Sequence, residues 1–240
     1  MPVALITGAG SLIGLGIAEA LAADGWRVVL TDIESTHIDP AVERLGGGRA
    51  RALPMDVTDT AAVRRTVARI AAEEGPIDGL VNAAGGMEGL GFPRRRFIET
   101  APREWRKILD VNLFGTLISS RAVLPAMIER GQGAIVSISS TAGLSGRPAA
   151  SVYAAAKAGV ILFTQNVSTE CAKHGVRVNA IAAGTARARW KDDPDGTDPP
   201  PLGQPATGRD IGDATAFLLS ARARHITGAC LDVSGGWALH

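Results

Sequence analysis

The sequence predicts an α/β fold built on a doubly wound parallel sheet. Short runs rich in β-branched residues alternate with Ala-rich helical patterns along the 240 residues, and this alternation is typical of a parallel sheet with helices on both faces. Several runs, such as VALI and AIVSI, show no polar alternation, as strands buried on two sides require. Neither an internal repeat nor a linker divides the chain, so we expect one domain spanning residues 1–240.

The expected elements follow one another in strand–helix order. Strands are expected at residues 3–6, 27–31, 51–54, 79–81, 134–138, 177–181 and 230–233. Helices are expected at residues 13–23, 60–74, 102–130, 151–174 and 209–220, with a weak helical pattern at 41–45. The stretch KDDPDGTDPPPLGQP at 191–205 is too rich in Pro, Asp and Gly for regular structure, so a surface loop is expected there.

Composition limits the classes of function. Hydrophobic residues make up 46% and charged residues 20% of the chain, which is typical of a soluble protein with a substantial core. A formal net charge of +1 gives no field that would favour nucleic acid or an anionic membrane as a partner. The N-terminus lacks the features of a signal peptide, and we find no apolar run near the roughly 20 residues that span a bilayer. We therefore expect a cytoplasmic protein.

Cysteine and histidine usage predicts no metal centre. Cys171 and Cys230 lie far apart in the sequence, and the four histidines are scattered. This distribution offers neither a disulfide framework nor the ligand spacing of a zinc site.

A glycine-rich run joins the first expected strand to the first expected helix. It reads VALIT, then GAGSLIG, then LGIAEALAADG. A tight turn here lets the backbone approach a pyrophosphate, and the helix N-terminus offers free N–H groups and a partial positive charge. An ordinary glycine-rich turn is the alternative, but the strand–loop–helix context favours a dinucleotide site. The candidate binding residues are Gly8, Gly10, Ser11, Leu12, Ile13 and Gly14.

The second expected strand ends in VVLTD, at Asp32. A carboxylate at this position accepts hydrogen bonds from the adenosine ribose hydroxyls of NAD and repels the 2′-phosphate of NADP. No arginine follows it directly, and the glycine loop carries Ser11 rather than a base. Asp32 therefore favours NAD, with NADP as the less favoured coenzyme, although an isolated aspartate here is also typical of a turn or a helix cap.

The motif YAAAK contains the only tyrosine of the chain, Tyr153, and ends at Lys157. Residues spaced i and i+4 share one helix face, so both side chains can point into one cleft. A phenol has a pKa of about 10 and is a poor base at neutral pH, but a nearby ammonium and an oxidised nicotinamide lower that pKa. We expect Tyr153 to take the proton of a substrate alcohol, or to give one to a carbonyl. An ordinary half-buried tyrosine and a solvated lysine are the alternative for an isolated pair.

The order of these features resembles the short-chain dehydrogenases/reductases in their single-domain form. TGAGSLIG, Asp32, DV at 56–57, NAAG at 82–85, Asn112, SS at 139–140, YAAAK and the closing TGACLDVSGG occur in the family's order over nearly the whole chain. The resemblance implies a Rossmann-type, seven-stranded parallel sheet in the order 3-2-1-4-5-6-7, forming a single dinucleotide-binding and catalytic domain. It also implies a homo-oligomer, a tetramer or a dimer.

The resemblance implies roles for further residues. Ser140 matches the serine that orients the substrate, with its neighbour Ser139 ranked second. Asn112 matches the asparagine that kinks a helix and holds a water relaying protons from Lys157, which is also expected to bind the nicotinamide ribose. Contacts near the coenzyme are implied for Asp56, Val57, Asn82, Ala83, Ala84, Gly85, Gly184 and Thr185.

Three features depart from the family pattern. Leu12 replaces the middle glycine of the loop, and a Cβ there costs about 1 kcal/mol or more if the position needs a positive φ. Ala183 and Ala188 replace a proline and a threonine after the sixth strand, so Thr185 is the alternative contact to the nicotinamide carboxamide. The substrate lid, expected at 185–207, is short, which suggests an open site or one closed by a neighbouring subunit or the C-terminus.

These features predict an NAD(H)-dependent oxidoreductase that interconverts a secondary alcohol and a ketone on a small organic substrate. The motifs equally allow a 3-oxoacyl-thioester reductase using NADPH, which Asp32 disfavours. A dinucleotide-binding module that has lost its chemistry is the non-enzymatic alternative, supported by Leu12, Ala183 and the short lid. The intact Ser–Tyr–Lys–Asn set argues against that alternative.

The substrate itself is left open by the sequence. Its walls are expected among residues 86–90, 142–144, Arg147 and 186–190. Arg94–Arg96, Arg187 and Arg189 are candidates for binding a carboxylate or a phosphate. Solvated arginines, or arginines in salt bridges between subunits, are the alternative interpretation.

Overall fold

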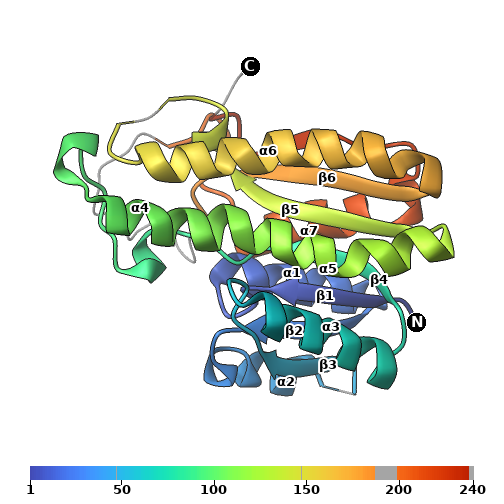
Figure 1. The fold of residues 1–240 in the computed structure, drawn as a ribbon. Coiled ribbons are helices and arrows are strands. Elements are labelled where there is room, and N and C mark those ends of the chain that lie inside the picture. The colour runs from blue at the N-terminus through green and yellow to red at the C-terminus, as the bar shows by residue number, and fades with distance from the viewer. Residues whose placement is uncertain (47, 147, 187–198, 238–240) are drawn as a thin grey trace.

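The computed structural model describes residues 1–46, 48–146, 148–186 and 199–237. Its strands form one seven-stranded sheet in the order β3-β2-β1-β4-β5-β6-β7, with every pair parallel (Figure 1). The predicted fold class and strand order are therefore confirmed. The strands are β1 (Val3–Thr7), β2 (Arg27–Asp32), β3 (Ala50–Pro54), β4 (Ile77–Asn82), β5 (Gly133–Ser140), β6 (Val176–Ala183) and β7 (Cys230–Val233).

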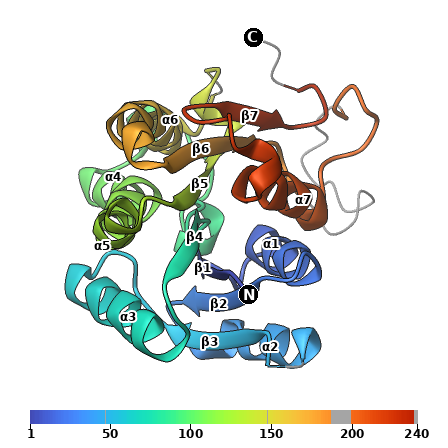
Figure 2. The same cartoon turned by 90° about the vertical axis from the view of Figure 1, so that its right-hand side faces the viewer.

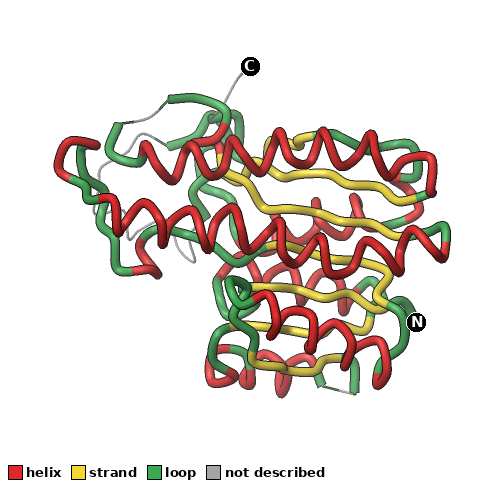
Figure 3. The backbone as a smooth tube through the Cα atoms, viewed as in Figure 1, coloured by secondary structure: helices red, strands yellow, loops and turns green. Residues whose placement is uncertain are grey.

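Helices cover both faces of the sheet, and helix alternates with strand along the chain (Figure 3). In Figure 2, α1, α2 and α7 lie on one face, and α3, α4, α5 and α6 lie on the other. The helices are α1 (Leu12–Ala23), α2 (Asp39–Leu45), α3 (Thr60–Glu73), α4 (Pro102–Leu109), α5 (Gly115–Arg130), α6 (Ser151–Cys171) and α7 (Gly208–Leu219). The expected helix at 102–130 differs from this in one respect, because a π-helical segment, Asp110–Phe114, separates α4 from α5.

Two apolar clusters fill the space between the sheet and its helices. In β1, Ala4 and Ile6 belong to the cluster that packs against α1 and α7, whereas Val3 and Leu5 belong to the cluster that packs against α3, α5 and α6. Successive strand side chains point to opposite faces. A strand covered on both faces therefore needs the unbroken apolar sequence seen in VALI.

Helices α1 and α7 approach each other unusually closely. A Cβ on Gly16 would lie 2.1 Å from the carbonyl carbon of Gly208, and a Cβ on Gly208 would lie 2.2 Å from the carbonyl oxygen of Leu12. Only glycine fits at such a backbone contact. The contact fixes the first turn of α1, and with it the glycine loop that precedes this helix.

One long helical stretch is apolar enough to be considered as a membrane span. Pro102–Arg130, which includes α4 and α5, has a mean hydropathy of 1.4 over its most apolar 18-residue window, 39% of which is buried. Charged residues interrupt this stretch, so it contains no uninterrupted apolar run of the length that spans a bilayer, although its mean hydropathy is high. Since α5 packs against β4 and α3, we interpret the stretch as part of a helical layer.

Gly16→Ala tests the contact between α1 and α7. The added methyl group must push the two backbones apart, so we expect a loss of about 2–3 kcal/mol in the free energy of unfolding, measured by urea denaturation. Gly89→Ala is the control, because nothing lies within 4 Å of a Cβ at Gly89, and we expect a change below about 0.5 kcal/mol. Equal effects of the two substitutions would contradict the close packing.

Candidate active site

The candidate residues gather at the carboxyl ends of the strands, on the left of Figure 1. The glycine loop follows β1, Asp32 ends β2, Asp56 follows β3, Asn82 ends β4 and Ser140 ends β5. In open parallel sheets, ligands bind at this edge, where the strand order reverses. Here the reversal lies between β1 and β4.

The glycine loop is compact, and its backbone is unstrained at Leu12, the residue that replaces the family's middle glycine. Gly8 has φ +65°, and a Cβ there would lie 2.4 Å from the Cα of Ala84. Ser11 caps α1, because its Oγ accepts a hydrogen bond from the N–H of Gly14 at 3.0 Å. Leu12 is the first residue of α1, is not among the described residues with positive φ, and is 40% exposed. The strain considered for Leu12 is therefore absent, and the N–H groups of the first turn have no partner within the helix.

Asp32 joins the end of β2 to the glycine loop. Its Oδ2 accepts a hydrogen bond from the N–H of Gly10 at 2.9 Å, and its Oδ1 accepts one from the N–H of Ile33 at 2.8 Å. His37, which the sequence reasoning missed, lies against Gly10 with Nδ1 3.3 Å from Oδ1 of Asp32. The Asp32 carboxylate thus holds the glycine loop against the end of β2, in addition to its predicted contact with the coenzyme ribose.

The end of β4 is held by two polar side chains. Oγ1 of Thr7 accepts hydrogen bonds from the N–H groups of Ala83 and Ala84, each at 3.2 Å. Nδ2 of Asn82 donates to two serine hydroxyls, at 3.0 and 3.1 Å. Asn82 thereby ties the end of β4 to α5 and β5, and its contact with the coenzyme stays a prediction. Thr7 was missed, although its place directly before the glycine loop was a usable signal.

The remaining predicted coenzyme contacts lie at neighbouring strand ends. Oδ1 of Asp56 accepts hydrogen bonds from the N–H and the Oγ1 of Thr58 at 2.8 and 2.7 Å, so this carboxylate stabilises the turn after β3. Val57 is 7% exposed. After β6, the N–H of Gly184 donates to the carbonyl of Val233 at 3.0 Å, and Thr185 is half-buried beside it.

Tyr153 and Ser140 meet where α6 passes the end of β5. The Ser140 hydroxyl lies close enough to the phenol to lower its pKa, and Oγ of Ser140 accepts a hydrogen bond from the N–H of Ala142 at 3.2 Å. Ser139 serves another purpose, because its buried Oγ donates to the carbonyl of Lys157 at 2.8 Å. The hydroxyl of Ser139 is thus occupied within the fold, and the substrate-orienting role of Ser140 stays a prediction.

Lys157 is 4% exposed, and its Nζ donates to the carbonyl of Ile138 at 2.9 Å. Nζ lies 5.7 Å from the centroid of the Tyr153 ring. Burial penalises the ammonium and lowers the pKa of Lys157 to about 8. Burial also raises the pKa of Tyr153, while the neighbouring hydroxyl of Ser140 and the charge of Arg94 lower it. The expected lowering of the tyrosine pKa by Lys157 does not appear in the protein alone, because desolvation of the phenolate dominates.

Asn112 lies in the π-helical segment, where a kink was expected, and is completely buried. Its Nδ2 donates to the carbonyls of Gly86 and Ile108 at 2.9 and 3.0 Å, and its Oδ1 accepts from the N–H of Gly86 at 2.8 Å. A Cβ on Gly85 would lie 2.6 Å from this Oδ1 and 3.0 Å from Nζ of Lys157. The amide thus clamps the segment after β4 against the lysine, and the water relay stays a prediction.

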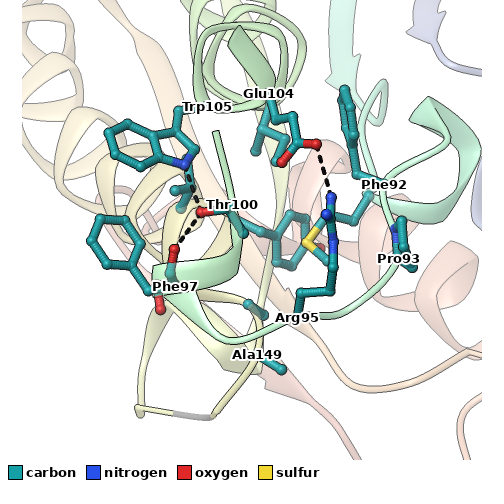
Figure 4. Close-up of a pocket in the computed structure, with 14 residues that line it drawn as sticks. Phe92, Pro93, Arg95, Phe97, Thr100, Glu104, Trp105 and Ala149 are labelled. Carbon is teal, nitrogen blue, oxygen red and sulfur yellow. Dashed lines mark hydrogen bonds and ion pairs between the residues drawn. The ribbon is translucent and has the colours of Figure 1, made fainter. Parts of the chain in front are cut away.

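Tyr153 is one of the residues that line a narrow recess, and Figure 4 shows Phe97, Thr100 and Trp105 on its wall. Phe97 and Trp105 stack with their ring centroids 5.0 Å apart, and Nε1 of Trp105 donates to Oγ1 of Thr100 at 2.7 Å. The free volume is about 20 Å³, which is room for about one water molecule. The recess is therefore a packed wall beside Tyr153 rather than a chamber for a substrate.

A family model described as short chain dehydrogenase matches residues 2–194. The chain belongs to this family. Galactitol 2-dehydrogenase (L-tagatose-forming) of Cereibacter sphaeroides is 38% identical, over 98% of this chain and 94% of its own. The 3-oxoacyl-[acyl-carrier-protein] reductase FabG of Escherichia coli (strain K12) is 36% identical, over 98% and 96%. The crystal structure of gox2181 superimposes with a TM-score of 0.91 at 32% identity, covering 98% of this chain and 95% of that one.

The segment at 185–207, expected to form the substrate lid, is described at 185–186 and 199–207. Ala186 pairs with Ala206 in an isolated parallel bridge. The N–H of Leu202 donates to the carbonyl of Gly235 at 3.1 Å, and a Cβ on Gly235 would lie 3.1 Å from Cβ of Pro200. The chain's own C-terminal segment thus contacts the second half of the lid. Arg147 and the candidates at 187–190 lie outside the described residues.

Lys157→Met tests the burial of the ammonium. The folded pKa of about 8 lies below the ordinary 10.5, so between these values the unfolded chain binds more protons and wild-type stability rises with pH. Relative to Lys157→Met, the wild-type free energy of unfolding should increase by about 2 kcal/mol from about pH 8 to about pH 9.5. Urea titrations at the two pH values measure this difference. A difference that stays flat with pH would contradict a buried ammonium.

Proposed function

We propose that this short-chain dehydrogenase is an NAD(H)-dependent oxidoreductase that interconverts a secondary alcohol and a ketone on a small organic substrate. The observation that carries the proposal is the gathering of Tyr153, Ser140 and the buried ammonium of Lys157 where α6 passes the end of β5, with Nζ of Lys157 5.7 Å from the centroid of the Tyr153 ring. This arrangement supplies an acid/base, a polarising hydroxyl and a positive charge at one point. A small-alcohol dehydrogenase among its relatives also supports the proposal.

The residues present fit a dinucleotide at the carboxyl ends of β1 to β4. Gly8 and Gly14 leave no room for a Cβ at the loop, and the free N–H groups that begin α1 suit a pyrophosphate. The nicotinamide coenzyme, when bound, takes up hydride from the carbinol carbon or returns it to the ketone carbon. Lys157 and the segment ending at Gly85 lie where the nicotinamide ribose is expected.

The chain's own residues handle the proton. In oxidation, Tyr153 as phenolate accepts the proton of the substrate hydroxyl, and in reduction the phenol returns it to the carbonyl oxygen. Ser140 holds the same oxygen by a hydrogen bond, which stabilises the charge that develops on it. The ammonium of Lys157, fixed by the carbonyl of Ile138, favours the phenolate electrostatically.

Asp32 supports NAD over NADP. A 2′-phosphate would stand against its carboxylate, which is already anchored by Gly10 and Ile33 and is therefore held in place. The 3-oxoacyl-thioester reductase using NADPH stays a second candidate, favoured by the similarity to the Escherichia coli reductase. The non-catalytic module loses one of its supports, because Leu12 sits in α1 without a positive φ.

We further propose a homo-oligomer, a tetramer or a dimer, acting in the cytoplasm on a small molecule without nucleic acid or membrane. Support comes from apolar side chains on the outer sides of the helical layer. Phe114 is 48% exposed beside α5, and Leu162 of α6 is 60% exposed. A second copy of the chain would bury both side chains.

Parallel calorimetric titrations with NAD⁺ and NADP⁺ test the coenzyme preference. We expect NAD⁺ to bind at least about 10-fold more tightly, because the carboxylate of Asp32 repels the additional phosphate. In Asp32→Asn, which keeps an acceptor for the N–H of Gly10, the gap should narrow through a gain in NADP⁺ affinity. Preference of the wild type for NADP⁺ would favour the thioester reductase. Binding of neither would favour the non-catalytic module.

Tyr153→Phe tests the chemistry. On a panel of neutral and acidic secondary alcohols that includes galactitol and cyclohexanol, we expect kcat/KM to fall by about 10²- to 10⁴-fold, the usual contribution of general acid–base catalysis. NAD⁺ affinity, measured on the same variant, should change much less because the ring is kept. Turnover at the wild-type rate would show that another group moves the proton.

A further inference from the structure

Three consecutive arginines, Arg94–Arg96, follow β4, and the structure distinguishes them. Arg95 donates to Oε1 of Glu104 at 2.8 Å, and Arg96 forms an ion pair with Glu99 at 2.5 Å. The side chain of Arg94 is exposed and makes neither an ion pair nor a hydrogen bond with any described residue. Among the described residues, Arg94 is therefore the arginine of this run whose positive charge has no acidic partner.

The backbone holds Arg94 next to the acid/base. The N–H of Arg95 donates to the carbonyl of Ala149 at 3.2 Å, and Ala149 has φ +65°. This bond docks the arginine segment onto the turn that precedes α6. Pro93 and Arg95, on either side of Arg94, line the recess that the Tyr153 ring closes (Figure 4). The Arg94 charge is felt at the phenol, whose pKa it lowers.

The packing around this segment decides where a substrate group can lie. The recess between it and Tyr153 holds about one water molecule, so a substrate arm does not enter there. Glu104, which pairs with Arg95, is only 13% exposed, and the hydrogen bond from Arg95 lowers its carboxyl pKa. Arg95 is therefore already occupied by Glu104, whereas the exposed Arg94 has a charge that acts on the Tyr153 phenol.

Resting on the proposed function, we propose that Arg94 binds a carboxylate of the substrate, so that the enzyme acts on hydroxy acids and the corresponding keto acids. A planar guanidinium matches a carboxylate with two parallel hydrogen bonds. The hydroxyl at the other end of the substrate reaches Tyr153 and Ser140. The acid group makes no covalent bond and serves to hold the carbinol carbon in place.

A charge series tests this assignment. The substrates are 3-hydroxybutanoate, 4-hydroxypentanoate and 5-hydroxyhexanoate, each compared with its primary amide, which has the same shape without the charge. For the best chain length we expect the wild-type kcat/KM to favour the acid by about 10- to 100-fold, the size of a charge-assisted hydrogen bond. In Arg94→Gln the ratio should fall to about 1, while Arg94→Lys keeps part of it.

The acid-to-amide ratio separates binding from effects on the phenol. Loss of the Arg94 charge also alters the pKa of Tyr153 and slows both substrates alike, and this effect cancels in the ratio. Arg96→Gln is the matched control, because it removes the same charge two residues away from an arginine already paired with Glu99. It should keep the wild-type ratio.

The outcomes are distinct for the two proposals. Turnover without preference for the acids, or equal losses in Arg94→Gln and Arg96→Gln, would overturn the carboxylate assignment and leave the oxidoreductase function standing. Absence of turnover of every acid, amide and ketone, with either coenzyme, would overturn the proposed function and this inference with it.

Discussion

The burial of Lys157 is the constraint on which the active end of the sheet depends. Removing an ammonium from water costs several kcal/mol unless well-placed hydrogen-bond acceptors in the protein offset the loss of hydration. Here Nζ donates to the carbonyl of Ile138, while the carbonyl of Lys157 itself accepts a hydrogen bond from Ser139. Both contacts join α6 to the last residues of β5. Because the helix is held in this register, Tyr153 lies one turn earlier on the same face and reaches Ser140. The acid/base geometry is thus a consequence of how the lysine is accommodated.

The same burial acts in opposite directions on the two titrating groups. It lowers the pKa of Lys157 and raises that of Tyr153, because a low-dielectric site disfavours the charged form of each. Left to burial alone, the phenol would stay protonated and would serve only as an acid. The neighbouring hydroxyl of Ser140 and the charge of Arg94 both lower the phenol pKa and so work against this. Proton removal from an alcohol therefore depends on positive charge that faces the phenol, and the protein itself supplies part of that charge from the segment after β4.

The features that depend on local pattern were predictable from the sequence. The strands, their order, the glycine loop and the placement of Ser140, Tyr153 and Lys157 follow from periodicity, from motif spacing and from the family resemblance. Features that depend on tertiary contacts were not. The apolar pattern of 102–130 is continuous, yet the helix changes to a π segment where the amide of Asn112 reaches Gly86. Arg94 and Arg95 are neighbouring residues of the same type, and the sequence alone does not show that only Arg95 forms an ion pair with Glu104. Leu12 departs from the family's glycine motif, but whether this strains the backbone depends on the φ angle at Leu12, which a sequence motif does not specify.

Discrimination between ligands in this enzyme has to come from local charges. The formal net charge is +1, so the protein has no strong long-range field to steer anions or repel cations. Exposed charges act over roughly one Debye length, about 8 Å at physiological ionic strength. Asp32, at the proposed coenzyme site, and Arg94, at the proposed substrate site, therefore act mainly on groups within about that distance. If the proposed roles hold, opposite charges at the two places exclude a phosphate at the adenosine ribose and still accept an acid beside Tyr153, which a site of uniform charge could not do.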